Sequence, residues 1–147
     1  MAGNAVVEAL AEQVGCYRKL AKLAQIQHEH VRQSRTEQLL EVLKNRQEVL
    51  QQVSAYEQVV GPAKRQWNDY LATLVAPERQ RAESLLAETR ELLQQITSAD
   101  RDDALVLQQR KLSLGKQIDQ AASARRVNQR YAAAAYGTKP SRMDLQR

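Results

Sequence analysis

Two histidines are the first residues in the chain whose type and proximity raise the question of a metal site. His28 and His30 flank Glu29 in a His-Glu-His run. On a helix, side chains two residues apart point about 200° apart around the axis, so the two imidazoles cannot share one ion. Metal-binding histidine pairs on helices are typically four residues apart. The run therefore predicts solvated histidines or histidines packed in a seam, and no metal site is expected.

Nucleophilic and acidic side chains also lack the neighbours that catalysis or calcium binding needs. Cys16 has no histidine within one helical turn and no second cysteine for a disulfide. Asp100, Asp102 and Asp103 lack the glycine and the final glutamate of a calcium loop, so helix capping explains them better. A glycine-rich phosphate loop and a Gly-x-Ser-x-Gly turn are absent from the sequence. We predict a protein that is not an enzyme, has no catalytic residues and needs no cofactor.

The composition indicates which elements must position any functional side chain. Ala, Leu, Arg, Glu and Lys make up 49% of the 147 residues, and the chain has only five Gly, three Pro and no Phe. This composition is typical of long helices and coiled coils, and it disfavours sheets. We predict an all-α fold, an elongated antiparallel bundle or coiled-coil hairpin of three to four helices. Residues 1–137 are expected to form one bundle domain, and 138–147 a flexible tail.

Apolar seams with alternating steps of three and four residues place the first helix. It is expected to span about 4–58, with a weakly apolar patch at 28–37 that indicates a kink, an overhang or a surface exit. Gly61-Pro62 is expected to end this helix, because glycine supplies a left-handed cap and proline cannot continue the hydrogen-bond ladder. A short helix over 62–75 then carries Trp67, which is interpreted as a core anchor or, less simply, as an interface residue.

A second long helical region follows the Ala76-Pro77 pair, which breaks the chain or starts a new helix. The seam continues through 77–136 without a further Pro. A reversal at 98–101 is the alternative to one unbroken helix, and the pattern leaves both open.

Charge is concentrated in the last third of the chain. Residues 104–147 carry a net charge of +7, against +5 for the whole chain. In the same region the apolar seam weakens from Leu107 and Ile118 to alanine and arginine, while Tyr131 and Tyr136 are large aromatics. Self-packing would need leucines there, so this helix is predicted to bind a partner. The predicted partner-binding residues are Arg125, Arg126, Asn128, Arg130, Tyr131 and Tyr136.

The N-terminal sequence predicts a soluble, cytoplasmic protein. The first 14 residues contain Glu8 and Glu12 and lack the basic start of a secretory signal. No apolar stretch approaches the roughly 20 residues that a membrane-spanning helix needs. We therefore expect a cytoplasmic location and no membrane span.

Two runs in the chain are similar to the flagellar export chaperone FlgN family. Residues 39–50, LLEVLKNRQEVL, resemble the middle of the first helix of that family. Residues 125–131, RRVNQRY, followed by Tyr136-Gly137 and a polar tail, resemble its C-terminal helix. Trp67, the break at Pro77 and the run Ala132 to Ala135 depart from the family pattern.

The resemblance implies a cytoplasmic chaperone of the bacterial flagellar type III export system. Such a chaperone binds hook–filament junction proteins (FlgK and FlgL) before secretion and presents them to the export gate. The resemblance also implies that the C-terminal helix and tail bind these partners. The alternatives are a coiled-coil stalk or scaffold of a secretion apparatus, and a basic helical protein that binds nucleic acid, which is the least favoured. The sequence leaves self-association open.

Overall fold

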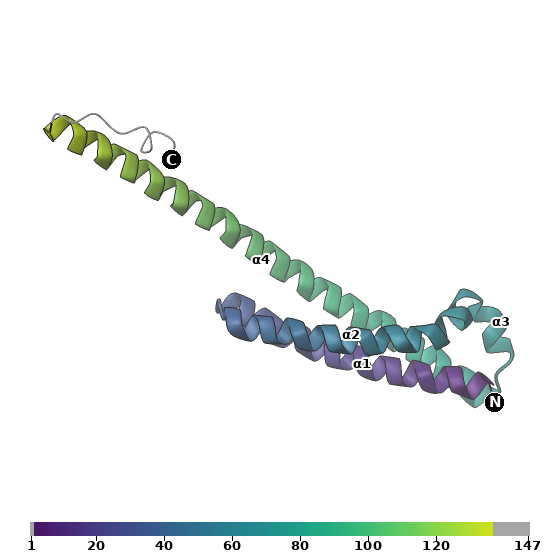
Figure 1. The fold of residues 1–147 in the computed structure, drawn as a ribbon. Coiled ribbons are helices and arrows are strands. Elements are labelled where there is room, and N and C mark those ends of the chain that lie inside the picture. The colour runs from purple at the N-terminus through teal and green to yellow at the C-terminus, as the bar shows by residue number, and fades with distance from the viewer. Residues whose placement is uncertain (1, 137–147) are drawn as a thin grey trace. The chain divides into compact units, whose positions relative to one another are not determined.

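The computed structural model describes the backbone of residues 2–136 and the side chains of residues 5–133 (Figure 1). Four helices account for 95% of the described residues, and no strand occurs among them. They are α1 (Ala2–Arg32), α2 (Thr36–Arg65), α3 (Trp67–Ala72) and α4 (Ala76–Tyr136). The predicted all-α fold is therefore confirmed. The predicted flexible tail, 138–147, lies outside the described residues.

The chain divides into two compact units, 1–106 and 107–147, although the sequence analysis treated 1–137 as one domain. The boundary falls inside α4, which is one helix by its hydrogen bonding. Unit 1 contains α1, α2, α3 and the first part of α4. The described part of unit 2 is the remainder of α4, from Leu107 to Tyr136.

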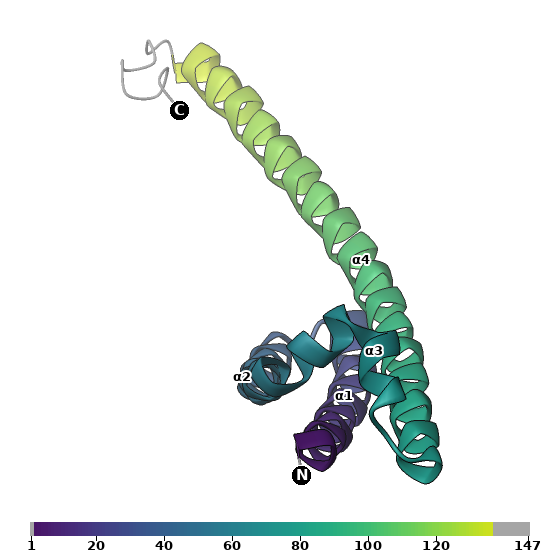
Figure 2. The same ribbon diagram turned by 90° about the vertical axis from the view of Figure 1, so that its right-hand side faces the viewer.

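Unit 1 is built from three long helical segments that pack side by side, with α1 between α2 and α4 (Figure 2). Hydrogen bonds join Gln13 to Val53 and Glu57, near the end of α2, so α1 and α2 run antiparallel. Glu8 pairs with Arg81, and Arg18 pairs with Glu88 further along both helices, so α1 and α4 run in the same direction.

Two apolar clusters form the core of unit 1. The first lies near the N-terminal end of α1, where partly buried side chains of α3 pack against it; its buried members are Val7, Leu74 and Ala82, and Trp67, Tyr70, Leu71 and Leu85 surround them. The second lies further along α1; its buried members are Tyr17, Leu20 and Ile96, with Ala21, Val49, Val53 and Leu92 around them. Trp67 thus contributes to the core cluster and stacks against Tyr70, with ring centroids 5.7 Å apart.

The first long helix is interrupted, which corrects the option of one unbroken helix over 4–58. The break falls inside the weakly apolar patch, where residues 33–35 form a turn between α1 and α2. Ser34 adopts a left-handed backbone with φ of 55°, and the Arg35 amide donates to the His30 carbonyl. The reversal lets α2 fold back along α1 and bury seam residues that one straight helix would leave exposed.

The expected end at Gly61-Pro62 is wrong, because α2 continues through both residues to Arg65. A proline inside a helix removes one backbone hydrogen bond, and buried Gly61 and Val60 hold this turn against the rest of unit 1. The helix instead ends at Gln66, whose extended φ of −126° starts the turn into α3. The expected break at Ala76-Pro77 is confirmed, since α4 begins at Ala76. Residues 98–101 are helical, so 77–136 forms one helix.

Replacing Ser34 with glycine is expected to stabilise unit 1 by about 0.5–1 kcal/mol. A left-handed backbone costs a non-glycine residue roughly 1–2 kcal/mol, and part of that gain is offset by the greater freedom of glycine in the unfolded chain. Chemical denaturation followed by the fluorescence of Trp67, the only tryptophan, measures the change. Ser84→Gly, at an exposed position inside α4, is the control and should lower stability by about 0.5 kcal/mol. A loss of stability in Ser34→Gly would contradict the left-handed turn.

Candidate partner-binding helix

The described part of unit 2 is a single helix, and a single helix has no second element against which to bury an apolar face. It spans 30 residues, or about 45 Å at 1.5 Å per residue. Most helical stability in proteins comes from the packing of such a face. The side chains of this helix are therefore the first place to look for a surface that binds another protein.

Large apolar side chains along this helix are exposed to solvent. Their exposed fractions range from 43% to 71%, and the residues are Leu107, Leu112, Leu114, Ile118, Val127 and Tyr131. Scattered exposed leucines are ordinary on protein surfaces, but large apolar side chains that share a helix face mark interaction sites. The question is therefore how these six side chains are distributed around the axis.

Helix periodicity sorts most of them onto two faces. Leu107, Leu114 and Ile118 are seven and four residues apart, so they share one side, which we call the leucine face. Val127 and Tyr131 are four residues apart and share another, the tyrosine face. At 3.6 residues per turn, Tyr131 lies roughly 120–140° around the axis from the leucine face. The helix thus offers two separate apolar surfaces.

The predicted partner-binding residues are spread around this helix and do not form one patch. Arg125, Arg126, Asn128, Arg130 and Tyr131 are all exposed. Tyr136 is the last residue of α4, and its side chain lies outside those described.

The tyrosine face has polar flanks that come from the predicted set. The spacing puts Arg126 and Arg130 together on one flank and Asn128 on the other, while Arg125 falls on the side of the leucine face. The sequence analysis overlooked Val127, although its spacing of four residues from Tyr131 is a sufficient signal. The tyrosine face with its arginine flank is the most coherent part of the predicted site.

Charge along this helix is strongly one-sided. Between 107 and 133 there are six basic residues and a single acidic one, Asp119. Basic side chains beside an apolar stripe favour an acidic partner and speed its diffusional encounter. The combination fits an amphipathic helix with acidic edges, docked through its apolar side.

Unit 1 contains a second notable arrangement, a buried polar cluster that joins three helices. Its members are Gln27 and His28 of α1, Arg46 of α2, and Asp100 and Asp103 of α4. The Gln27 amide nitrogen donates to the Asp103 carboxylate at 3.1 Å, and its oxygen accepts from the Arg46 guanidinium at 2.6 Å. His28 Nδ1 lies 2.7 Å from the same Asp103 carboxylate, whose side chain is only 2% exposed.

Arg46 completes this cluster by binding Asp100 with two parallel hydrogen bonds of 2.8 Å. Hydrogen bonding to Asp100 raises the pKa of the Arg46 guanidinium above its ordinary value and outweighs burial, which lowers it. The cluster is therefore a charged, fully engaged connection between helices. The sequence analysis interpreted these aspartates as helix caps, which is wrong because α4 passes through them without a break.

The remaining candidate chemistry has no arrangement that supports it. Cys16 is buried and free, and burial raises the pKa of its thiol, which keeps it protonated and unreactive near neutral pH. A hollow of about 410 Å³ beside the buried polar cluster is lined by Gln25, His28, Glu29, Ala99 and Asp102. Among the described residues, no group of three or more His, Cys, Asp or Glu side chains is placed to hold a metal ion.

Comparison with known proteins adds no further identification. No family model, curated protein or solved structure matches the chain. In the part of the chain that was described, no helix has a stretch that is both long and apolar enough to cross a membrane.

Proposed function

We propose that the protein is an export chaperone of the bacterial flagellum that binds hook–filament junction proteins (FlgK-like and FlgL-like) in the cytoplasm before secretion. The observation that carries the proposal is the helix of unit 2, which exposes an apolar tyrosine face next to Arg126 and Arg130. A chaperone for export must hold an apolar segment of its client while both remain in solution. An amphipathic helix with an unpartnered apolar face is suited to that task.

The proposed division of labour follows from the two units. Unit 1 has its own apolar core and interhelical hydrogen bonds, so it serves as the folded body. Unit 2 binds the client: Tyr131 and Val127 supply apolar contact, and Arg126 and Arg130 orient an acidic edge of the client helix. A component of the export gate is the second proposed partner.

The client class comes from the resemblance of residues 39–50 and 125–131 to the FlgN family, and the binding surface comes from the exposed side chains. These two supports are separate. If junction proteins do not bind but an acidic amphipathic helix does, the surface assignment survives and the flagellar assignment fails. If neither binds, a structural stalk of a secretion apparatus becomes the better interpretation.

Replacing Tyr131 with alanine is expected to weaken client binding at least tenfold. The side chain is 71% exposed in the free protein, so its removal leaves the fold intact but deletes the largest apolar contact of the tyrosine face. The affinity for a purified junction protein is measured by isothermal titration calorimetry. Gln129→Ala is the matched control, because Gln129 is exposed, two residues away and on the opposite side of the helix. Equal affinity for both variants would remove Tyr131 from the site.

A parallel titration with single-stranded and double-stranded nucleic acid separates the remaining alternative. Binding through phosphate contacts weakens steeply with salt and does not depend on an aromatic contact with a client helix. Tight, salt-sensitive nucleic-acid binding without binding of junction proteins would replace the chaperone proposal with the nucleic-acid one.

A further inference from the structure

Helix α2 carries an exposed apolar stripe on the side away from the core. Leu40, Leu43 and Leu50 are between 42% and 62% exposed, and their spacing of three and seven residues places them on one side. Val42 is buried and Val49 packs against the core, so the inner face of the same helix is already satisfied. The stripe therefore has no role in holding unit 1 together. We call it the α2 stripe.

One polar residue interrupts the α2 stripe. Gln47 lies four residues after Leu43 and three before Leu50, on the same side of the helix. The leucine face of unit 2 has the same pattern, because Lys111 lies four residues after Leu107 and three before Leu114. If the two helices lie side by side with Leu43 level with Leu107, then Leu50 meets Leu114. The two interruptions, Gln47 and Lys111, then meet each other.

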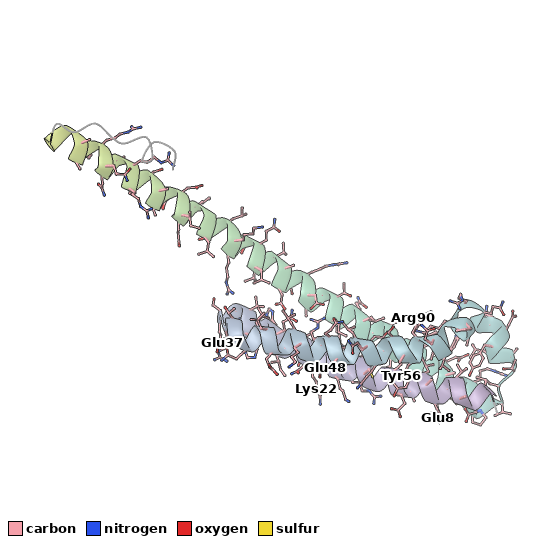
Figure 3. The ribbon with its side chains drawn as sticks, viewed as in Figure 1. Glu8, Lys22, Glu37, Glu48, Tyr56 and Arg90 are labelled. Carbon is pink, nitrogen blue, oxygen red and sulfur yellow. The ribbon has the colours of Figure 1, made fainter. Side chains whose placement is uncertain are left out.

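Charge distinguishes this pairing from pairing of like stripes. Glu37, Glu41 and Glu48 are exposed on α2 around the stripe, against Lys44 and an Arg46 already bound to Asp100 (Glu37 and Glu48 are labelled in Figure 3). The unit 2 helix is basic throughout. Two α2 stripes would bring glutamates together, and two leucine faces would bring lysines and arginines together. Only the mixed pairing sets an acidic surface against a basic one.

We propose that the α2 stripe of one copy of the protein binds the leucine face of a second copy. The same chain carries both surfaces, so two copies can form the contact twice around a two-fold axis, or once in an open chain. The inference does not depend on the flagellar client, because the tyrosine face lies on another side of the unit 2 helix. It also leaves Tyr131 and Val127 available while copies are associated.

Sedimentation velocity of the full chain over a range of concentrations tests the proposal. The unchanged protein should associate as its concentration rises, and the association should weaken with added salt. Two double variants each remove one surface: Leu43→Gln with Leu50→Gln, and Leu107→Gln with Leu114→Gln. Each variant alone should raise the dissociation constant at least tenfold. Leu112→Gln, equally exposed but off the leucine face, is the control and should leave it unchanged.

Mixing the two double variants gives the decisive result. Each retains the surface that the other lacks, so the mixture should form a 1:1 complex although neither variant associates alone. A protein that is monomeric at every concentration, including one whose two surfaces meet within one chain, would overturn the proposal. It would also fail if only one double variant lost association, which indicates pairing of like surfaces, or if the mixture stayed monomeric. Circular dichroism of each variant confirms that its helices are retained.

Discussion

Replacing Asp103 with alanine should lower the free energy of unfolding of unit 1 by about 2–3 kcal/mol. The carboxylate accepts a hydrogen bond from Gln27, which is itself only 7% exposed, and contacts His28. Without it, the buried Gln27 amide nitrogen loses its acceptor, and an unsatisfied buried polar group costs about 1–3 kcal/mol. The small cavity left behind adds to that cost. Chemical denaturation followed by Trp67 fluorescence provides the measurement.

Two substitutions make this prediction specific to the buried contact. Asp103→Asn keeps an oxygen that can accept from Gln27, so it should cost less than half as much as alanine. Asp102→Ala removes the same functional group from the neighbouring, exposed position and should change stability by less than about 0.5 kcal/mol. If Asp103→Ala costs no more than Asp102→Ala, the buried polar cluster does not contribute to the stability of unit 1.

The apolar seams were sufficient to predict the helices, because burial of a periodic face is what holds each of them in place. Leu10, Val14 and Tyr17 of the predicted first seam are buried in unit 1. Ala76-Pro77 marks a true helix start, since proline favours the first turn. These features depend on local sequence and on one apolar side, and both can be read without knowing which helices meet.

The turn at 33–35 could not be located from the sequence because its residues lack the usual signals. It contains neither Gly nor Pro, and Ser34 adopts a conformation that glycine would adopt more easily. Gly61-Pro62 carries the usual signals, yet the chain stays helical there. In both places tertiary packing of α2 against α1 outweighs the local preference of the backbone.

The buried polar cluster was missed because its partners are 19 to 76 residues apart in the chain. A partial signal existed: His28 and Arg46 both occupy positions in the apolar seams, where a polar side chain needs a partner. The basic helix of the candidate site was predictable from charge alone. Its division into a leucine face and a tyrosine face required the helix to continue unbroken through residues 107–136, which the sequence left open.

Removing the chain after Ala124 should abolish client binding while leaving unit 1 folded. The cut deletes Val127 and Tyr131 with their arginine flank, which together form the proposed surface. Every residue of the two core clusters and of the buried polar cluster lies before residue 104. The denaturation midpoint reported by Trp67 should therefore stay within experimental error of the full chain.

Titration of a purified hook–filament junction protein into the full chain and into this truncated form tests the central claim most directly. We expect saturable binding to the full chain, with a stoichiometry of one client per copy, and no measurable binding to the truncated form. Undiminished binding by the truncated form would contradict the assignment of the site to the helix of unit 2. Absence of binding to the full chain would contradict the proposed chaperone function itself.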